Sequence, residues 1–398
     1  MMSAGPANAG AAALPLDGVR VIEFTQVMMG PCCTQMLGDY GADVIKIERA
    51  GMGDLSRWSV GEDPDGGNNP VFASLNRNKR SLALDLRSEA DRNVVRRLVE
   101  TADVVVNNFR PGVMERLGFG YEELRDINPR IIWAMGSGYG RDGPYVRKGK
   151  GGQDVLAQAM TGAMHRRSGP EIPLSVYPTA LADYAAGMHL VQGILFALLQ
   201  RERTGEGQQI SVSLYNSMLA MQMQEAAMHL MRGRELNWAA YPLSGVFKTT
   251  DGAIVMVGAF KENPLREICR ALDLDDLSEI PKYADHDRQT AHRSELQAIF
   301  RERFASGTTD HWVERLEAVD ILCAPVLSLE EALADPQTAF NRMVVESEPT
   351  AAGPVRLVGS PIEMSAAAFA IRHPPPRLDE HRDEVLAELD GVREEPAA

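Results

Sequence analysis

The chain has 398 residues, of which 44% are hydrophobic and 24% charged, and its formal net charge is −14. The length favours two domains and the composition is that of a globular protein. The acidic balance excludes wholesale binding of nucleic acid or of an anionic membrane, but it leaves room for a local basic pocket that holds one polyanionic ligand.

Three further features of the sequence indicate the compartment and the ligands to expect. Residues 1–13 have neither a basic start nor an apolar run, so they predict a disordered tail and not a secretion signal. The longest apolar stretch, near 190–199, is interrupted by Gln192 and Gly193 and is too short to span a membrane. The four cysteines and eight histidines show no metal-ligand spacing. We therefore expect a reduced, cytoplasmic protein without a metal ion, a membrane or a nucleic-acid partner.

In the first third of the chain, short apolar runs alternate with helical patterns. Strands are predicted over 18–24, 43–49, 103–109 and 130–140. Helices are predicted over 30–42, 88–102 and 121–128. In the second of these helices, Ser88 stands at the cap position and Val95 and Leu98 form the buried face. Such alternation predicts an α/β fold with a parallel sheet covered by helices on both faces.

The remainder of the chain has a different pattern of predicted elements. A helix runs from Asp183 to about Arg203, and a strand leads into a Met-rich helical segment over 218–233, which predicts a helix buried between domains or subunits. Short strands, a turn at 251–252 and further helical patterns then predict a smaller α+β domain. We expect a large domain over 14–224, a small domain over 225–325, and a return segment over 326–398 that completes the large domain.

Asp183 stands alone among small and apolar residues in the stretch PTALADYAAGMHL. Taken by itself, an Asp at the start of a helix is more often a cap than a catalytic group, because its carboxylate accepts backbone N–H bonds that would otherwise be unpaired.

Basic segments stand out in this acidic chain at 76–80 (NRNKR) and 147–150 (RKGK). Each alone is typical of a solvated surface. Together with Arg49 at the end of one predicted strand and residues 108–110 at the end of another, they predict a phosphate-bearing ligand beyond the carboxyl ends of the strands. The glycines of 136–143 (GSGYGRDG) follow a late strand and precede a basic loop, so they do not predict a dinucleotide fingerprint.

Several segments carry a family resemblance: 24–49 (FTQVMMGPCCTQMLGDYGADVIKIER), 75–86 (LNRNKRSLALDL), 102–119, 181–208, 323–336 and 380–386. In this order they resemble the class III CoA-transferase (CaiB/BaiF) family, the superfamily of formyl-CoA transferases and 2-methylacyl-CoA racemases. The resemblance covers nearly the whole chain after the tail and is weakest in the small domain. It implies a Rossmann-like large domain built from both ends of the chain, a smaller central domain, and an interlocked homodimer.

The resemblance also implies a reaction, the transfer of CoA from an acyl-CoA donor to a carboxylic acid with coenzyme A as the shared substrate. Asp183 aligns with the family's nucleophile, which forms an aspartyl anhydride and an aspartyl-CoA thioester. A carboxylate suits this task because it holds the acyl group in an activated form, whereas a serine ester would be a poor acyl donor.

The remaining site residues come from the same resemblance. It places the nucleotide end of CoA near Arg49, Leu84, Arg87, Asn108, Phe109, Arg110 and Arg116. It places Val27, Met28 and Met29 at the reaction centre, where backbone N–H groups could stabilise an oxyanion, and Lys150 in a loop that approaches CoA.

Two departures from the family pattern leave alternatives open. Formyl-CoA:oxalate transferases carry Gln where this chain has Met28, and their glycine-rich small-domain loop is missing here, so oxalate is not the expected substrate. The racemases carry Gly-His-Asp where this chain has Gly152-Gln153-Asp154, and Gln cannot act as a proton-transfer base. An acyl-CoA racemase or other isomerase is the first alternative, and a non-catalytic CoA-binding protein is the second.

Overall fold

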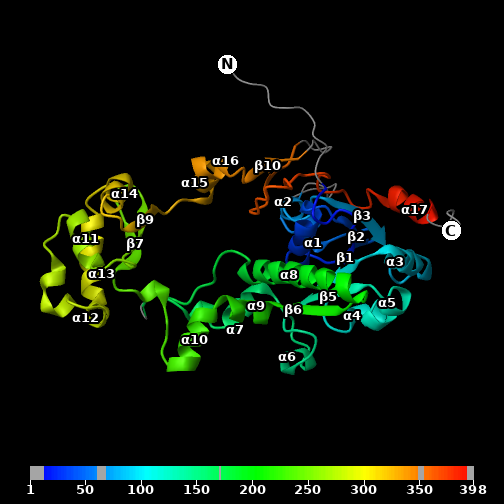
Figure 1. Ribbon diagram of the computed structural model, residues 1–398, viewed down its shortest axis with the longest axis horizontal. Helices are drawn as coiled ribbons and strands as arrows, with labels where there is room; N and C mark the ends of the chain where they lie inside the picture. Colours follow the sequence, from blue (N-terminus) through cyan, green and yellow to red (C-terminus); the bar gives the residue numbers. More distant parts are fainter. Residues whose placement is uncertain (1–12, 61–68, 170–171, 348–353, 392–398) are drawn as a thin grey trace, which may run out of the picture. The chain divides into compact units, whose positions relative to one another are not determined.

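In the computed structural model, residues 13–60, 69–169, 172–347 and 354–391 are described, so residues 1–12 of the predicted tail lie outside the described part. The chain divides into two units (Figure 1). The first comprises Met1–Ala163, Val176–Gln222 and Ala339–Ala398, and the second comprises Met164–Ser175 and Met223–Thr338. The second unit therefore includes residues 164–175 and 326–338, which the sequence analysis assigned to the large domain.

The first unit contains a six-stranded parallel sheet in the order β3-β2-β1-β4-β5-β6. The strands are β1 (Arg20–Phe24), β2 (Asp43–Arg49), β3 (Lys79–Leu84), β4 (Val104–Asn107), β5 (Ile132–Ser137) and β6 (Gln209–Ser213). Their Val- and Ile-rich runs suit strands buried on both faces. This order confirms the predicted Rossmann-like α/β fold. From β1, the chain adds β2 and β3 on one side of the sheet and then β4, β5 and β6 on the other side. Such sheets bind ligands at this change of side, here between β1 and β4, at the carboxyl ends of the strands.

Helices cover both faces of this sheet. The first unit contains α1 (Met29–Asp39), η1 (Leu55–Trp58, a short 3-10 helix), α2 (Pro70–Ala73), α3 (Glu89–Thr101), α4 (Val113–Leu117), α5 (Tyr121–Ile127), α6 (Pro144–Arg147), α7 (Asp154–Met160), α8 (Leu181–Thr204), α9 (Leu214–Met221) and α17 (Arg382–Gly391). A second 3-10 helix, η2 (Ala163–His165), begins at the last residue of the segment Met1–Ala163 and continues into the second unit. Alternate strand residues pack against α3, α5 and α17 on one face and against α1 and α8 on the other. Val95 and Leu98 are buried as predicted, but the Ser88 side chain accepts no capping hydrogen bond from the described residues of α3.

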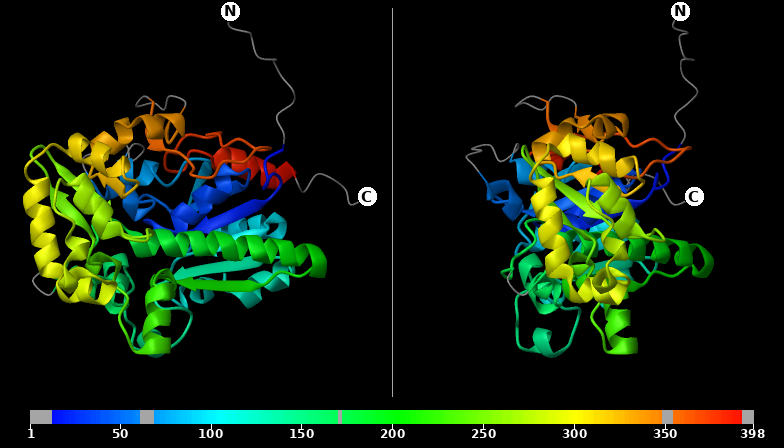
Figure 2. Two further views of the ribbon diagram at one scale, coloured as in Figure 1. Left: turned by 60° about the vertical axis from the view of Figure 1, so that its left-hand side comes forward. Right: turned by 90° about the vertical axis from the view of Figure 1, so that its left-hand side faces the viewer.

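The long helix α8 lies along the sheet (Figure 2). It has 24 residues and is long and apolar enough to cross a membrane by length and composition, which the sequence analysis did not expect of any segment. Its residues Leu190 and Ile194 are fully buried in the core, where α8 packs against α1, β5, β6 and α9. These contacts bury one side of α8, whereas Phe196 and Leu199 on the same helix are 68% and 64% exposed.

A segment from the far end of the chain covers the outer edge of β3. The N–H of Ala83 donates to Asp379 Oδ1 at 2.7 Å, and the N–H of His381 donates to Ser81 O at 3.1 Å. The helix that follows, α17, adds an ion pair between Glu384 and Arg80. Residues 344–346 (β10, Val344–Glu346) and 356–358 (β11, Arg356–Val358) form a separate antiparallel pair in the same unit.

The second unit contains an antiparallel sheet in the order β7-β8-β9 and several helices, as expected of an α+β domain. Its elements are α10 (Met223–Arg232), η3 (Trp238–Ala240), β7 (Ser244–Lys248), β8 (Ala253–Val257), α11 (Pro264–Ala271), η4 (Leu277–Glu279), η5 (Pro281–Tyr283), α12 (His286–Ala291), α13 (Arg293–Phe304), α14 (Thr309–Glu317), β9 (Leu322–Pro325), α15 (Leu329–Ala334) and the start of α16 (Pro336–Phe340). The Met-rich segment predicted as one helix forms two, α9 and α10. None of the residues of α10, all of them described, is buried within this chain.

Candidate active site

Asp183 is the third residue of α8, whose N-cap is Ala180, so it lies in the first helical turn and is not the cap. The capping carboxylate comes from elsewhere: Asp154, the first residue of α7, accepts the N–H groups of Ala182 at 2.7 Å and Asp183 at 3.1 Å. Asp154 is held in turn by Gln158, which donates to its Oδ2 at 2.6 Å. Within the described residues, no hydrogen bond or ion pair engages the Asp183 carboxylate, so it is available for chemistry.

The surroundings of Asp183 disfavour its charged form. Burial, together with the nearby carboxylate of Asp154, raises the pKa of Asp183 from 3.8 to about 6. A helix N-terminus favours a carboxylate by about 0.3–1 kcal/mol, which limits this increase without cancelling it. The result is a carboxylate that is ionised near neutral pH, poorly solvated, and therefore more reactive than one in water.

The raised pKa predicts a pH dependence. If Asp183 reacts as the carboxylate, kcat/KM should rise tenfold per pH unit below about pH 6 and level off above it. Replacing Asp154 with Asn removes one of the two causes, so the rise should move to lower pH. Initial rates from pH 4.5 to 8.5, with matched buffers, measure both curves. An unchanged midpoint in Asp154→Asn would contradict the contribution of Asp154.

The first turn of α1 packs closely against α8. A Cβ added at Gly187 would stand 2.2 Å from Cys32 Sγ and 2.7 Å from Met29 O, so only glycine allows this approach. Burial and the charge of Asp183 raise the pKa of the Cys32 thiol to about 12. Cys32 therefore stays protonated and donates to Met29 O at 3.2 Å, which makes it a packing residue and not a second nucleophile.

The predicted reaction-centre residues 27–29 form the turn between β1 and α1. Val27 has a positive φ of 67°, a left-handed conformation that costs a β-branched residue about 1–3 kcal/mol. Its N–H donates to Asp54 Oδ1 at 3.0 Å, so Val27 cannot supply an oxyanion donor as the sequence analysis allowed. Within the described residues, the N–H groups of Met28 and Met29 donate to no partner, as expected at a helix N-terminus. These two remain as the possible donors.

Asn108 holds the same turn from β4. Its Oδ1 accepts the Gln26 N–H at 2.9 Å and its Nδ2 donates to Gln26 O at 2.7 Å. Asn108 was predicted near CoA, and it does line a cavity, but its amide is used to fix the backbone next to Val27.

A cavity of about 280 Å³ opens at the carboxyl ends of β1, β2, β3 and β4. Arg49, Leu84, Arg87 and Phe109, which the resemblance places near the nucleotide end of CoA, all line it. Leu84 is buried and Phe109 half-buried, which provides an apolar wall for a base, whereas the exposed Arg49 and Arg87 provide cations at the rim. The Arg87 side chain already pairs with Asp85 at 2.9 Å, so Arg49 is the stronger choice for a phosphate.

A second cavity, of about 180 Å³, lies beyond β4 and β5 and contains Asn108, Phe109, Arg110 and Lys150 in its wall. Phe109 lines both cavities. The backbones of Gly138 and Gly152 touch in its wall, where a Cβ on Gly152 would lie 2.2 Å from the Cα of Gly138. Two residues after Gly152 comes Asp154, so this wall leads directly to the cap of α8. Arg116, exposed on α4, lines neither cavity, and its role stays a prediction.

The basic segment 76–80 was expected to meet a ligand, and for its cations this was wrong. Arg77, Lys79 and Arg80 are buried at the amino end of β3. They pair with Asp39 at 2.7 Å, Glu23 at 3.1 Å and Asp43 at 2.7 Å, respectively. Because buried charges need partners inside the protein, these cations stabilise the fold through their ion pairs and do not contact a ligand.

Two site residues were missed by sequence reasoning. Asp154 was noted only as part of a triplet, and nothing in the sequence shows that it caps a helix that begins 27 residues later. Asp54 lies in GMGDLSRW, where a glycine before an Asp is the signal for a tight turn. That signal predicts the turn but not its bond to Val27.

The comparisons with known proteins define the class. A model of CoA-transferase family III matches residues 16–382, so the chain belongs to this family. It is 34% identical to the human succinyl-CoA:glutarate CoA-transferase over 94% of this chain and 86% of that protein. It is 33% identical to the formyl-CoA:oxalate CoA-transferase of Escherichia coli O157:H7 over 96% of this chain and 98% of that protein.

Solved structures agree with this assignment. Rv3272 from Mycobacterium tuberculosis, in its orthorhombic form, is similar with a TM-score of 0.83 and 32% identity, over 94% of this chain and 99% of that one. A CaiB/BaiF family protein from Brucella suis is similar with a TM-score of 0.84 and 30% identity, over 95% and 100%. The family resemblance found in the sequence is thereby confirmed.

Proposed function

We propose that this chain transfers CoA from an acyl-CoA donor to a carboxylic acid, with Asp183 as the covalent nucleophile. The observation that carries the proposal is a half-buried carboxylate in the first turn of α8 that has no partner among the described residues. At Gly187 the same helix packs against the first turn of α1, where the N–H groups of Met28 and Met29 lie. The two cavities at the adjoining sheet edge have the apolar walls and cations that the nucleotide end of CoA requires.

The reaction proceeds through four substitutions at carbonyl carbon. The Asp183 carboxylate attacks the donor thioester, the C–S bond breaks, and CoA leaves as a thiolate from a mixed anhydride. The thiolate attacks the Asp183 carbonyl and releases the donor acid, which leaves an aspartyl-CoA thioester. The acceptor carboxylate attacks this thioester and again expels the thiolate. The thiolate finally attacks the acceptor carbonyl, which yields the new acyl-CoA and frees Asp183.

Each of these steps passes through a tetrahedral intermediate with a negatively charged oxygen, which the N–H groups of Met28 and Met29 can stabilise. Water must be kept from the anhydride, because hydrolysis would waste the thioester energy. The fully buried Ala182 and Ala186 on α8 supply small apolar surroundings without a competing nucleophile.

The relatives suggest the class of acids. Their names specify succinyl-CoA with glutarate and formyl-CoA with oxalate. We therefore propose a dicarboxylic acid on at least one side of the exchange, with oxalate disfavoured because Met28 replaces the Gln of that group. A screen of succinyl-, acetyl- and longer acyl-CoA donors against a panel of mono- and dicarboxylic acids identifies the pair.

Covalent trapping tests the proposal directly. Incubation with an acyl-CoA followed by hydroxylamine should convert Asp183 to a hydroxamate, and borohydride should reduce the aspartyl-CoA thioester, each at one peptide by mass spectrometry. Asp183→Ala should give neither product. If the wild-type chain binds CoA but never forms an adduct, it is a CoA-binding protein without catalysis.

The racemase alternative has less support. Gln153 uses its side-chain oxygen to accept the Val155 N–H at 2.9 Å and so caps α7, and its amide cannot relay a proton. Incubation of a 2-methylacyl-CoA in D₂O should therefore incorporate no deuterium at C2. Incorporation that depends on Asp183 would favour the isomerase.

Arg49 provides a test of CoA binding. We expect Arg49→Ala to weaken CoA binding about fivefold to tenfold at low salt, because one charge-assisted contact to phosphate is lost, and less at high salt. Isothermal titration at 50 and 300 mM salt measures the change. The control is Arg125→Ala, which should bind CoA normally. Arg125 is an exposed arginine of α5 that pairs with Glu122 at 2.7 Å. Equal affinities for all three chains would remove Arg49 from the site.

We also propose an interlocked homodimer. Apolar side chains of α10 are exposed in the single chain, with Leu230 at 82% and Met231 at 76%, and a second subunit would cover them. Sedimentation at nanomolar concentration should show only the dimer, because interlocked chains cannot separate on dilution. A folded, active species at the mass of one chain would contradict it.

A further inference from the structure

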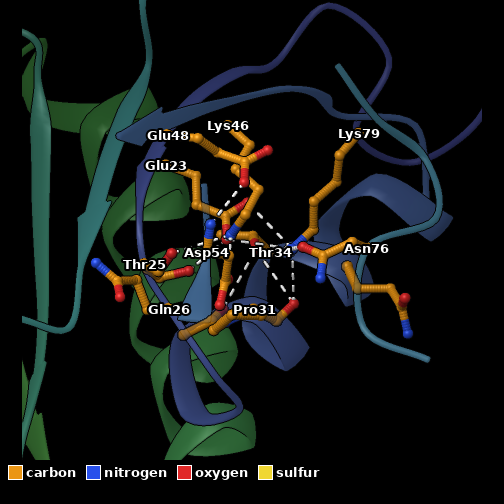
Figure 3. A network of polar contacts seen from close by, with 12 residues as sticks. Glu23, Thr25, Gln26, Pro31, Thr34, Lys46, Glu48, Asp54, Asn76 and Lys79 are labelled. Atoms are coloured by element: carbon orange, nitrogen blue, oxygen red, sulfur yellow. Dashed lines mark hydrogen bonds and ion pairs between the residues drawn. The ribbon is translucent and has the colours of Figure 1, made fainter. Parts of the chain in front are cut away.

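Four charged side chains are completely or almost completely buried beneath the β1–α1 turn (Figure 3). Lys46 Nζ lies 3.1 Å from Glu23 Oε1 and 2.9 Å from Asp54 Oδ2, and Lys79 Nζ lies 3.1 Å from Glu23 Oε2. The cluster, here called the ionic quartet (Glu23, Lys46, Asp54, Lys79), has two carboxylates and two ammonium groups. Its charges therefore balance when all four are ionised.

The ionic quartet bonds the backbone of the turn at three points. Lys46 donates to Thr25 O at 2.9 Å, Asp54 accepts the Val27 N–H at 3.0 Å, and Lys79 donates to Pro31 O at 3.0 Å. The three contacts bracket residues 25–31, the segment that includes Met28 and Met29. Three members of the ionic quartet therefore form hydrogen bonds with the backbone of the β1–α1 turn.

Asp54 holds the strained residue of this turn. Val27 adopts its left-handed φ of 67° although a β-branched side chain disfavours it, so its neighbours must fix it there. Asp54 can do so because it is itself fixed: its N–H donates to Glu48 Oε2 at 2.8 Å, and its Oδ1 also accepts the Ser56 N–H at 2.8 Å. Burial would raise the pKa of Asp54, but Lys46 and the N–H donors lower it to about 2, so it stays an acceptor.

We propose that Asp54 is a positioning residue for CoA transfer: by bonding the Val27 N–H, it holds the β1–α1 turn in the left-handed conformation that leaves the Met28 and Met29 N–H groups free beside Asp183. The proposal rests on the function proposed above. It gives a role in positioning to a buried charge cluster of which Asp54 lines the first cavity, whereas Glu23, Lys46 and Lys79 line neither cavity.

A stabilising role alone does not explain the ionic quartet. Buried ion pairs are often no more stabilising than apolar residues of similar volume, because each ion loses its hydration. The opposite end of α1 supplies a comparison within the chain. There, Asp39 is fully buried and pairs with Arg77 at 2.7 Å, but it bonds no residue of the 25–31 segment.

The experiment compares Asp54→Ala with Asp39→Ala, since each removes one buried carboxylate from a buried cation. We expect Asp54→Ala to lower kcat about 100-fold with KM for acyl-CoA within about threefold, because misplaced donors act in the transition state. Asp39→Ala should destabilise the fold comparably but keep kcat within about threefold. Asp54→Asn, which keeps an acceptor for Val27, should retain more of kcat than Asp54→Ala, and it serves if Asp54→Ala does not fold.

Rescue separates positioning from stability. Glycine accepts a positive φ without strain, so Val27→Gly should restore part of kcat, about tenfold, when added to Asp54→Ala. Loss of kcat in both Ala variants in proportion to their stability, or no loss in Asp54→Ala, would overturn the proposal.

A readout independent of transfer distinguishes this proposal from the function on which it rests. Hydrogen exchange of the Val27 amide should accelerate in Asp54→Ala and not in Asp39→Ala, whatever the reaction. Absence of an Asp183 adduct in the wild-type chain would refute the transferase. An unchanged Val27 exchange rate in Asp54→Ala would refute the positioning role alone.

Discussion

Asp183→Asn is expected to abolish CoA transfer, by about 10⁴-fold or more, and at the same time to stabilise the folded chain above pH 6. The loss follows because an amide cannot form the anhydride. The gain follows because the pKa of Asp183 is raised in the fold from 3.8 to about 6. A group with a raised pKa contributes stability below its unfolded value and loses it as the pH rises through the folded value.

The expected size of this gain comes from the shift itself. Each pKa unit corresponds to about 1.4 kcal/mol, and because Asp183 is only half-buried we expect about 1–2 kcal/mol at pH 7.5. At pH 3.5 most of this difference should disappear, since Asp183 is then protonated in the folded state and about two-thirds protonated in the unfolded state. Thermal unfolding at the two pH values measures the difference. An inactive Asn variant that is no more stable at pH 7.5 would show that Asp183 is not strained by its site.

Gly187→Ala is expected to damage both the fold and the reaction. The new Cβ would meet Cys32 Sγ and the Met29 carbonyl at 2.2 and 2.7 Å, and a backbone oxygen cannot turn aside. Relief requires α1 and α8 to separate, which we expect to cost about 2–3 kcal/mol. The movement would carry Met28 and Met29 away from Asp183 and lower kcat about 100-fold.

The same helix offers a matched control for this substitution. A Cβ at Gly193 would meet only the flexible end of Ile210, at 3.2 Å, and alanine favours a helix over glycine by about 1 kcal/mol. Gly193→Ala should therefore leave the rate unchanged and keep or improve stability. Chemical denaturation and steady-state kinetics of both variants decide the matter. A Gly187→Ala chain that matches the control would mean that the two helices are not held at this distance.

Much of the fold could be predicted because its signals are local. Runs such as residues 104–106 (VVV) are apolar enough to be part of a buried strand and follow an amphipathic helix, so the elements and the fold class follow from periodicity. The strand order could not be predicted in this way, because neighbours such as β1 and β4 are separated by about 80 residues of intervening chain. Segment 164–175 belongs to the second unit for a similarly non-local reason, its contacts with residues after 222.

The candidate site shows the same limit at the level of single residues. Sequence could mark Arg49 and Phe109, because strand ends in such sheets face ligands. It could not distinguish Arg49 from Arg77, since both are basic residues next to predicted strands, and only the fold shows that Arg77 is paired with Asp39. Likewise, the capping role that the sequence offers for Asp183 belongs to Asp154, which lies on a different helix.

The cover on the edge of β3 has a consequence for how the protein is made. Ala83 and its partner Asp379 are 296 residues apart, so at about 5–20 residues per second the ribosome needs about 15–60 s to deliver the segment that closes this edge. During that interval the nascent sheet presents an open strand to other chains. Arg80, whose partners Glu384 and Glu388 arrive only with that late segment, is then a charge on this strand that disfavours mispairing. We therefore expect Arg80, which makes no ligand contact in the finished protein, to disfavour pairing of the unfinished sheet with other chains during synthesis.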